Sequence, residues 1–487
     1  MKSRLLAALL CLITSAPAVP VPIWGPLSRN LNGGAFAKEA LDNDCLCNCY
    51  SAGFEQTGGS TEARLIRRDN TGALTGTGTP PAALVGAPSA TVFAGVDAET
   101  SGADIFVVGT HYPAGVAPGQ PSRLLVVKYN SAFNITAQLT LAAIPGLAGV
   151  EVTGCRVFIP PTGLNILGGI PAIFVCGCTE QGIFVMPLDR MTLSPVVAWG
   201  NGGAFAIGGV CPRHLMPGIQ PAQVPFHSCR QSFMEMLPQA SLYLGGTLGT
   251  GNGGQFTVAR IGPVTGQLIA PFGVQTFPAG GNFVKAMAVA GQNAVAHITL
   301  AGGTRQVTWD ASGAVRSVDQ GQVFANAGQM PLLQSLNDVE MRAGLFNGLQ
   351  GSFVHLCGKH AASGQVWCFF LPVANFPPLF LYSRDYGAAP DAANEAVDLA
   401  LGTRAPYVGW TVATGVTKAG TNFDAPLMAV HPAGTPFSYS ALPNQNPPLP
   451  DRGNAALWQF PCNPHAHGNR ETVPGSAWEG RQTYWLP

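Results

Sequence analysis

Charged residues are scarce in this chain of 487 residues. Lys, Arg, Asp and Glu together make up 10% of it, against about 25% in an ordinary soluble protein. The 25 basic residues balance the 25 acidic ones, so the formal net charge at pH 7 is zero. A chain without a net field has no general attraction for nucleic acid or for an anionic membrane surface. We expect neither as a partner.

Long apolar runs and familiar catalytic motifs are also missing. Gly, Pro or a charged residue interrupts every later apolar stretch before it reaches the roughly 20 residues of a membrane-spanning helix. Neither the G-x-S-x-G elbow nor the H-E-x-x-H pair occurs. Residues 249–254 fit G-x-G-x-x-G, but segment 255–261 alternates like a strand, whereas a dinucleotide site needs a helix there. We therefore expect no cofactor and interpret 249–254 as a hairpin loop.

The first residues have the layout of a secretory signal peptide. Lys2 and Arg4 precede an apolar run at 5–13, and Ala16 and Ala18 offer a small-residue cleavage site. We expect removal of residues 1–18, a mature chain beginning near Val19, and a secreted or surface-associated protein. The alternative is an uncleaved membrane anchor, which needs a longer apolar run of roughly 20 residues.

Eleven of the 12 cysteines follow that cleavage site. In an oxidising compartment most should form disulfides, and an odd number leaves one thiol for a bond to another chain. The sequence thus allows a disulfide-linked oligomer. The candidate pairs are Cys357 with Cys368, Cys211 with Cys229, Cys155 with Cys176 or Cys178, and Cys462 with one of Cys45, Cys47 and Cys49.

Other readings of these residues are less favoured. The trio at 45–49 alternates along an expected strand, which cannot wrap a zinc ion as a turn can. Cys462, His465 and His467 lack a second segment to complete a metal site. We therefore expect no metal. Asn134, in Asn-Ile-Thr, is the one glycosylation acceptor and matters only if the host glycosylates secreted proteins.

One unit recurs along the chain, which contains 61 Gly and 41 Pro yet is 47% hydrophobic. It consists of an apolar strand ending in Gly, a polar loop, a second apolar strand and a turn, as in 173–177 and 183–189. Seven residues between Asp69 and His431 occupy the same turn position of the unit, and the six intervals between them average about 60 residues. The turn residues are Asp69, Asn130, Asp189, Gly262, Asp310, Val373 and His431.

Each hairpin is flanked by two further strand-like runs, such as 150–158 before it and 195–199 after it. Four antiparallel strands per unit make one propeller blade, and blades stacked in a ring shield each other's apolar faces. The sequence therefore predicts an all-β fold, a seven-bladed β-propeller of four-stranded blades over residues 19–440. Residues 441–487, rich in Pro and Trp, are expected to form an irregular tail that packs on the propeller or extends from it.

The stretch 185–203 resembles the delta-60 repeat of secreted propeller proteins. That repeat has an aromatic-Asn/Asp turn, then Phe-Gly and Gly-Gly before the next strand. Phe272-Gly273 and Tyr129-Asn130 keep parts of it, whereas Pro372 and Pro432 depart from it. The resemblance covers roughly 30–440 and implies a propeller in an extracellular or surface setting, with no implied reaction.

Function is less well defined by the sequence than fold. The leading hypothesis is a secreted binding or structural module that presents one propeller face to a protein or glycan partner. The alternatives are a carbohydrate-active hydrolase or lyase with carboxylates at the channel mouth, and a component of a surface or particle. Candidate residues on innermost strands, where they would line the channel, are Glu151, Glu235, Lys285, Glu340, Arg342 and Glu395.

Overall fold

The structure is a computed structural model, and the part of the chain that it describes is built from β-strands. It describes residues 21–27, 35–43, 48–57, 60–69, 73–78, 81–86, 88–99, 103–115, 120–160, 165–166, 169–211, 213–215, 225–227, 233–237, 241–249, 253–278, 284–290, 293–300, 303–319, 333–346, 349–360, 366–373, 382–385, 395–401, 411–419, 422–424 and 427–431. Within these ranges the one helical element is the 3-10 turn η1 (Ala82–Leu84). None of their helices could cross a membrane.

Strands β2 to β9 form two groups of four, which a single parallel bridge between Thr61 and Ala90 joins. Sheet 1 consists of β2 (Ala35–Asn43), β3 (Cys49–Thr57), β4 (Ser60–Arg68) and β5 (Leu74–Gly78). Sheet 2 consists of β6 (Ala90–Ala98), β7 (Asp104–Tyr112), β8 (Arg123–Asn130) and β9 (Ile135–Leu141). Sheet 3 consists of β10 (Thr153–Phe158), β12 (Ile170–Thr179), β13 (Gly182–Asp189) and β14 (Phe205–Gly208), with β11 (Asn165–Ile166) paired to β12.

The following sheets repeat this order. Between sheets 3 and 4, β15 (Arg213–Leu215) pairs with β16 (Pro225–His227). Sheet 4 consists of β17 (Phe233–Leu237), β18 (Ser241–Leu248), β19 (Gln255–Ile261) and β20 (Val274–Pro278). Sheet 5 consists of β21 (Val284–Ala290), β22 (Asn293–Leu300), β23 (Gly303–Trp309) and β24 (Val315–Asp319). Sheet 6 consists of β25 (Leu333–Phe346), β26 (Leu349–His360), β27 (Val366–Val373) and β28 (Tyr382–Asp385).

The last sheet combines strands from both ends of the described chain. Sheet 7 consists of β29 (Glu395–Leu401), β30 (Thr411–Ala419), β32 (Leu427–His431) and β1 (Val21–Leu27), with β31 (Asn422–Asp424) paired to β30. Strand β1 takes the outer place that the chain itself fills in sheets 1 to 6. The sequence pattern had not indicated this pairing.

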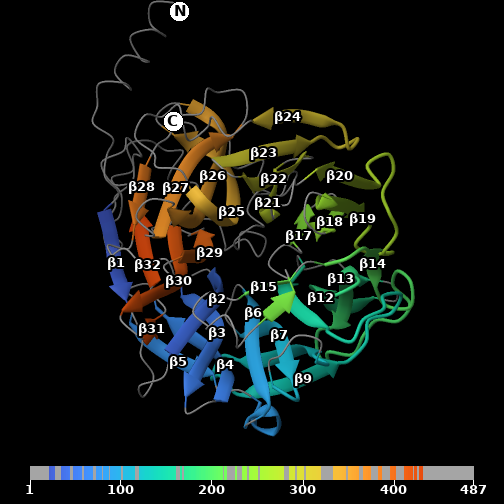
Figure 1. The fold of residues 1–487 in the computed structure, drawn as a ribbon, viewed down its shortest axis with the longest axis vertical. Coiled ribbons are helices and arrows are strands. Elements are labelled where there is room, and N and C mark those ends of the chain that lie inside the picture. Colours follow the sequence, from blue (N-terminus) through green and yellow to red (C-terminus); the bar gives the residue numbers. More distant parts are fainter. Residues whose placement is uncertain are drawn as a thin grey trace, which may run out of the picture.

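The sheets surround a common centre, with first strands inside and fourth strands outside (Figure 1). Each first strand contacts the next, from β2 through β6, β10, β17, β21 and β25 to β29, and β29 contacts β2. The all-β, propeller-like arrangement expected from the repeat is therefore present.

The recurring turn residue lies where the third strand ends. In four sheets its side-chain oxygen accepts hydrogen bonds from the turn that follows, a local pattern that Asp and Asn favour. Asp189 Oδ1 accepts from the backbone N–H groups of Met191 and Thr192 at 2.9 and 2.7 Å. Equivalent bonds are made by Asp69, Asn130 and Asp310. These turns share one end of the sheets, which we call the turn face.

Several predicted strand bounds were wrong. The fourth strand of sheet 3 is β14 at 205–208, whereas the segment predicted as strand, 195–199, forms turns. Leu193, which has a φ of 60°, and the glycines at 200, 202 and 203 hold a wide turn there. The second strand of sheet 1 is described from Cys49 and that of sheet 7 from Thr411.

Middle strands are buried on both faces, which explains their continuous apolar runs. Strand β12 is buried from Ala172 to Thr179, while the outer strand β9 alternates in exposure. The largest buried side chains include Trp199 and Trp309, each fully buried. Trp199 donates its indole N–H to the Pro263 carbonyl at 2.8 Å and so links sheet 3 to sheet 4.

The glycine expected to end the second strand lies inside that strand instead, since β7 continues past Gly109 to Tyr112. In five sheets it lies opposite the first-strand residue at which the register slips by one, a β-bulge. A Cβ on Gly109 would overlap the carbonyl oxygen of Val92, and one on Gly177 that of Thr153. The pairs are Gly53–Lys38, Gly109–Phe93, Gly177–Gly154, Gly358–Leu336 and Gly415–Ala396.

Candidate functional site

The ring of first strands brings most of the predicted site residues onto one structural feature. Glu235 lies on β17, Lys285 on β21, Glu340 and Arg342 on β25, and Glu395 at the start of β29. Lys285 is the extra residue of a bulge, between Val284 and Ala286 in the pairing with β22. Bulges at such places redirect side chains, which is one reason they occur beside binding sites.

Glu151 lies instead in the connector between β9 and β10. Its backbone N–H, like that of Val150, donates to the carboxylate of Glu180, at 3.0 and 2.7 Å respectively. Its side chain is buried, and Ser122 pairs with it in a parallel bridge. The structure thus places Glu151 at the end of the sheets opposite the turn face, which we call the connector face, within a rigid backbone network.

Charge is concentrated on the first strands. They carry 12 charged residues in 57, whereas the whole chain carries 50 in 487. Eight of these residues are acidic and four basic, while the third strands carry seven basic and two acidic residues. The first-strand residues are Lys38, Glu39, Asp42, Asp97, Arg156, Glu235, Lys285, Asp338, Glu340, Arg342, Glu395 and Asp398. The ring therefore has an acidic excess in a chain of zero net charge.

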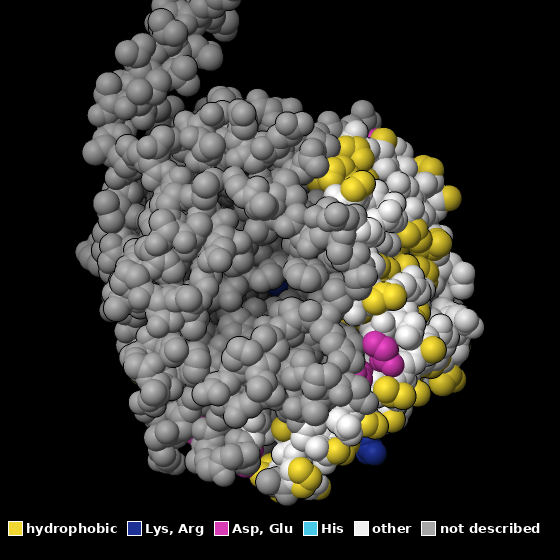
Figure 2. All heavy atoms as spheres, viewed as in Figure 1, with side chains coloured by type: hydrophobic (Ala, Val, Ile, Leu, Met, Phe, Trp, Pro, Cys, Tyr) yellow, Lys and Arg dark blue, Asp and Glu magenta, His cyan; other side chains and the backbone are white. Residues whose placement is uncertain are grey.

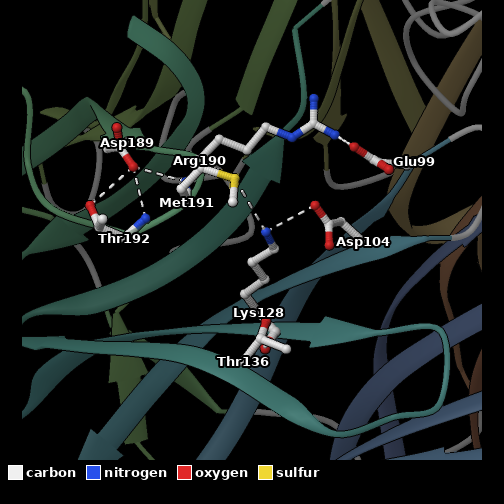
Figure 3. Close-up of polar contacts among 8 residues, drawn as sticks. All are labelled: Glu99, Asp104, Lys128, Thr136, Asp189, Arg190, Met191 and Thr192. Carbon is white, nitrogen blue, oxygen red and sulfur yellow. Dashed lines mark hydrogen bonds and ion pairs between the residues drawn. The ribbon is translucent and has the colours of Figure 1, made fainter.

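A group of ion pairs that sequence reasoning missed joins sheets 2 and 3. Lys128 of β8 pairs with Asp104 at 2.9 Å and lies 4.0 Å from the sulfur of Met191, in the turn after β13. Arg190 of that turn pairs with Glu99, at the end of β6 (Figure 3). Burial lowers the pKa of Arg190. Because every charge shown has a partner across or within the sheets, these groups stabilise the stacking of the sheets.

One serine–histidine contact occurs among the described side chains. His111 Nε2 lies 2.9 Å from the hydroxyl of Ser89, whose hydrogen is donated to the Leu84 carbonyl at 2.9 Å. The histidine nitrogen must then donate to Ser89, so it cannot act as the base for that hydroxyl. Burial, followed by the charge of Arg123, lowers the pKa of His111. This pair is not arranged for nucleophilic catalysis.

The described cysteines are buried thiols, and this corrects one predicted disulfide. Cys155 and Cys176 are joined by a hydrogen bond instead of a covalent bond, and Cys178 bonds to the hydroxyl of Thr153 at 3.1 Å. Burial, followed by the bond to Cys155, raises the pKa of the Cys176 thiol well above its usual range. The bulge at Cys155 removes it from a direct cross-strand position opposite Cys176, which Arg156 takes.

The other cysteine predictions are tested less directly. The backbone register places Cys357 directly opposite Cys368, as a cross-strand bridge requires. Cys211 is buried as a thiol, while its predicted partner Cys229 lies outside the described residues, as do Cys45 and Cys462. Among the described residues no group of three metal-ligating side chains occurs.

The glycosylation candidate Asn134 is exposed, in the turn between β8 and β9. Its backbone N–H donates to the side chain of Asn130 at 3.0 Å. It therefore lies on the turn face.

Comparison with known proteins adds a fold-level resemblance alone. No family model matches the chain, so the delta-60 resemblance stays a prediction, and no curated protein matches it. Similar solved structures include the WD40 domain of SCAP from fission yeast (10% identity, TM-score 0.37, 82% of each chain) and the Dos1 propeller (8%, 0.41, 86% of this chain and 95% of that one). A third is the polysaccharide lyase Uly1 (9%, 0.43, 84% and 91%). At such identities and TM-scores these neighbours bear on neither the ligand nor the activity of this chain.

Proposed function

We propose that the protein is a secreted, seven-bladed β-propeller in which β1 closes the ring and the mature chain begins near Val19. Three features support this architecture. The first strands contact one another around the centre, the turn residues recur about every 60 residues, and β1 completes sheet 7. A signal peptide cleaved at residue 18 would leave β1 intact, because that strand starts at Val21.

The function that the chain supports best is binding, with the ring of first strands as the contact surface. The observation that carries this proposal is the acidic excess of the ring: apart from the buried Asp97, the first strands carry seven acidic against four basic residues. Carboxylates grouped around one axis favour a cationic partner and steer its approach. The partner class that matches is therefore a protein with a basic segment, and a glycan is the alternative occupant.

Binding of a labelled oligolysine peptide by the full chain tests this proposal. The predicted result is binding that weakens as salt is added and that falls at least tenfold in the variant Glu235→Gln/Glu340→Gln/Glu395→Gln. The control Gln138→Ala, at an exposed position of the outer strand β9, should bind as the parent does. Absence of oligolysine binding, or equal binding by the triple variant, would contradict the proposal. Binding of neutral oligosaccharides on a glycan array would favour the glycan instead.

A carbohydrate-active enzyme is the second candidate, because the same ring carries Glu235, Glu340 and Glu395 on three different sheets. Glycoside hydrolysis requires two carboxyl groups facing each other across a cleft. Incubation with a panel of polysaccharides, followed by measurement of new reducing ends, distinguishes it from a binder. Glu340→Gln should abolish product release if the enzyme hypothesis holds.

A further inference from the structure

On the turn face, hydrogen bonds join the turns that follow the third strands of sheets 3, 4 and 5 into a belt. Gly200 N–H donates to the Thr265 carbonyl at 3.1 Å, which joins the turn of sheet 3 to that of sheet 4. Arg260, near the end of β19, donates to the Ala311 carbonyl at 3.2 Å, which joins the third strand of sheet 4 to the turn of sheet 5. Each turn is therefore braced by the next, and the belt presents a rigid surface.

The surface of this belt is apolar. On the described surface in view, at the right and lower right of Figure 2, apolar side chains recur and charged ones are few. Belt residues from sheets 3 to 5 account for five of the large exposed apolar side chains: Met191 (67% exposed), Val197 (70%), Leu268 (45%), Val274 (40%) and Val315 (47%). Exposed apolar groups gathered in one region mark a surface that another segment or partner covers.

The carboxyl-terminal segment begins on the same face. His431 ends the third strand of sheet 7, the position at which Asp189 and Asp310 begin the belt turns of their own sheets. The 56 residues that follow contain three of the eight Trp of the chain and six charged residues. Trp458 is 27 residues beyond His431, and a coil of that length spans roughly 30 Å. Fully extended, the same 27 residues can span up to about 90 Å, which exceeds the diameter of about 57 Å expected for a compact domain of some 400 residues.

We infer that residues 441–487 dock across the belt at sheets 3 to 5, with Trp458 and Trp478 covering the apolar side chains there. Residues 441–487 follow a strand that ends on the turn face, and the chain is long enough to reach the belt from there. Their Trp side chains match the apolar side chains of the belt. The inference rests on the ring closure in the proposed function, and not on any ligand at the first strands. The segment that covers the belt is therefore part of the same chain.

Photo-crosslinking in the full chain tests the inference. A photoreactive phenylalanine analogue replaces Val197 on the belt or, as the matched control, Val150 on the connector face, which is 55% exposed. After irradiation and digestion, mass spectrometry should find Val197-site crosslinks to peptides from 441–487 within one chain. The Val150 site should give none.

Three results would overturn the inference. They are a Val197 site that gives no tail peptide, equal yields from the two sites, or crosslinks between two copies in place of crosslinks within one. A second measurement uses Val197→Asp/Leu268→Asp, in which proteolysis of the tail should be at least tenfold faster than in Val150→Asp. Failure of ring closure would appear separately, as rapid amide exchange of residues 21–27, and failure of ligand binding would leave the crosslinks unchanged.

Discussion

Val21 lies directly opposite His431 in the antiparallel pair of β1 and β32. The first and last described strands are therefore neighbours, although about 400 residues separate them in the sequence. The pairing is irregular, since seven residues of β1 run beside five of β32 with two register shifts. In the proposed seven-bladed ring, closure therefore depends on a strand that joins sheet 7 from the other end of the chain.

Removal of that strand should unfold or aggregate the protein. Deletion of residues 19–27 exposes the edge of β32, whose unpaired backbone groups attract other strands. We expect a lowered Tm and soluble aggregates in size-exclusion chromatography. Deletion of residues 1–18 alone is the control and should leave both unchanged. An unaltered Tm in the 19–27 deletion would show that β1 does not close the ring.

Substitution of the bulge glycines should destabilise the fold. Gly109→Ala and Gly177→Ala place a Cβ against backbone carbonyl oxygens that cannot move freely, and overpacking of this kind costs about 1–3 kcal/mol. Gly208→Ala is the control, because no atom lies within 4 Å of its added Cβ, and it should change stability by less than about 0.5 kcal/mol. Guanidinium unfolding measures all three. Equal stabilities would contradict the bulge assignment.

Loss of the indole donor at position 199 should weaken the contact between sheets 3 and 4. Trp199→Phe leaves the Pro263 carbonyl without the bond at 2.8 Å, and a buried acceptor without a partner costs about 1–3 kcal/mol. Val150→Ala, on the connector face and 55% exposed, serves as the control with an expected change below about 0.5 kcal/mol. If the two variants unfold alike, Trp199 does not link the sheets.

The Asp189 turn should make stability depend on pH in acid. Burial alone would raise the pKa of this carboxyl, but hydrogen bonds from Thr192 and Met191 outweigh it and lower the pKa. Because the pKa of this carboxyl is lower in the folded state, its ionised form stabilises the fold above the unfolded-state pKa of about 3.9. That contribution to the free energy of unfolding disappears as the pH falls through the folded-state pKa. The free-energy difference between the parent and Asp189→Asn should be constant from about pH 5 to 7 and shrink below about pH 4.

The equivalent turn in sheet 2 provides the control for this titration. Asn130 accepts the same kind of bonds with an amide that does not titrate. The stability difference between the parent and Asn130→Ala should therefore be the same at pH 3.5 and pH 6, two values chosen to bracket the carboxyl range of about 4. A difference for Asp189→Asn that stays constant in acid would contradict the turn assignment.

Much of the architecture could be predicted because it depends on local patterns. Asp189 and Asp310 mark turns through bonds to their own neighbours, and a glycine of the second strand marks a bulge in five sheets, so both recur at readable intervals. Predictions failed where the local signal was ambiguous. Segment 195–199 has an apolar pattern typical of a strand, yet the wide turn delays the fourth strand to Phe205.

The site was less predictable because it depends on contacts between distant segments. Glu235 and Glu395 could be assigned to first strands, since these strands precede each recognisable hairpin. Glu151 was misplaced because its connector resembles the beginning of a strand until Glu180 fixes its backbone. Neither segment has a sequence pattern that predicts the pairing of Val21 with His431. This pairing could therefore be identified only from the structure.

Hydrogen exchange of residues 21–27, followed by mass spectrometry, tests the closed ring most directly. The account predicts that their amides exchange as slowly as those of 427–431, and that the latter lose protection when 19–27 is deleted. Exchange of 21–27 at the rate of an unstructured peptide in the full chain would contradict closure by β1.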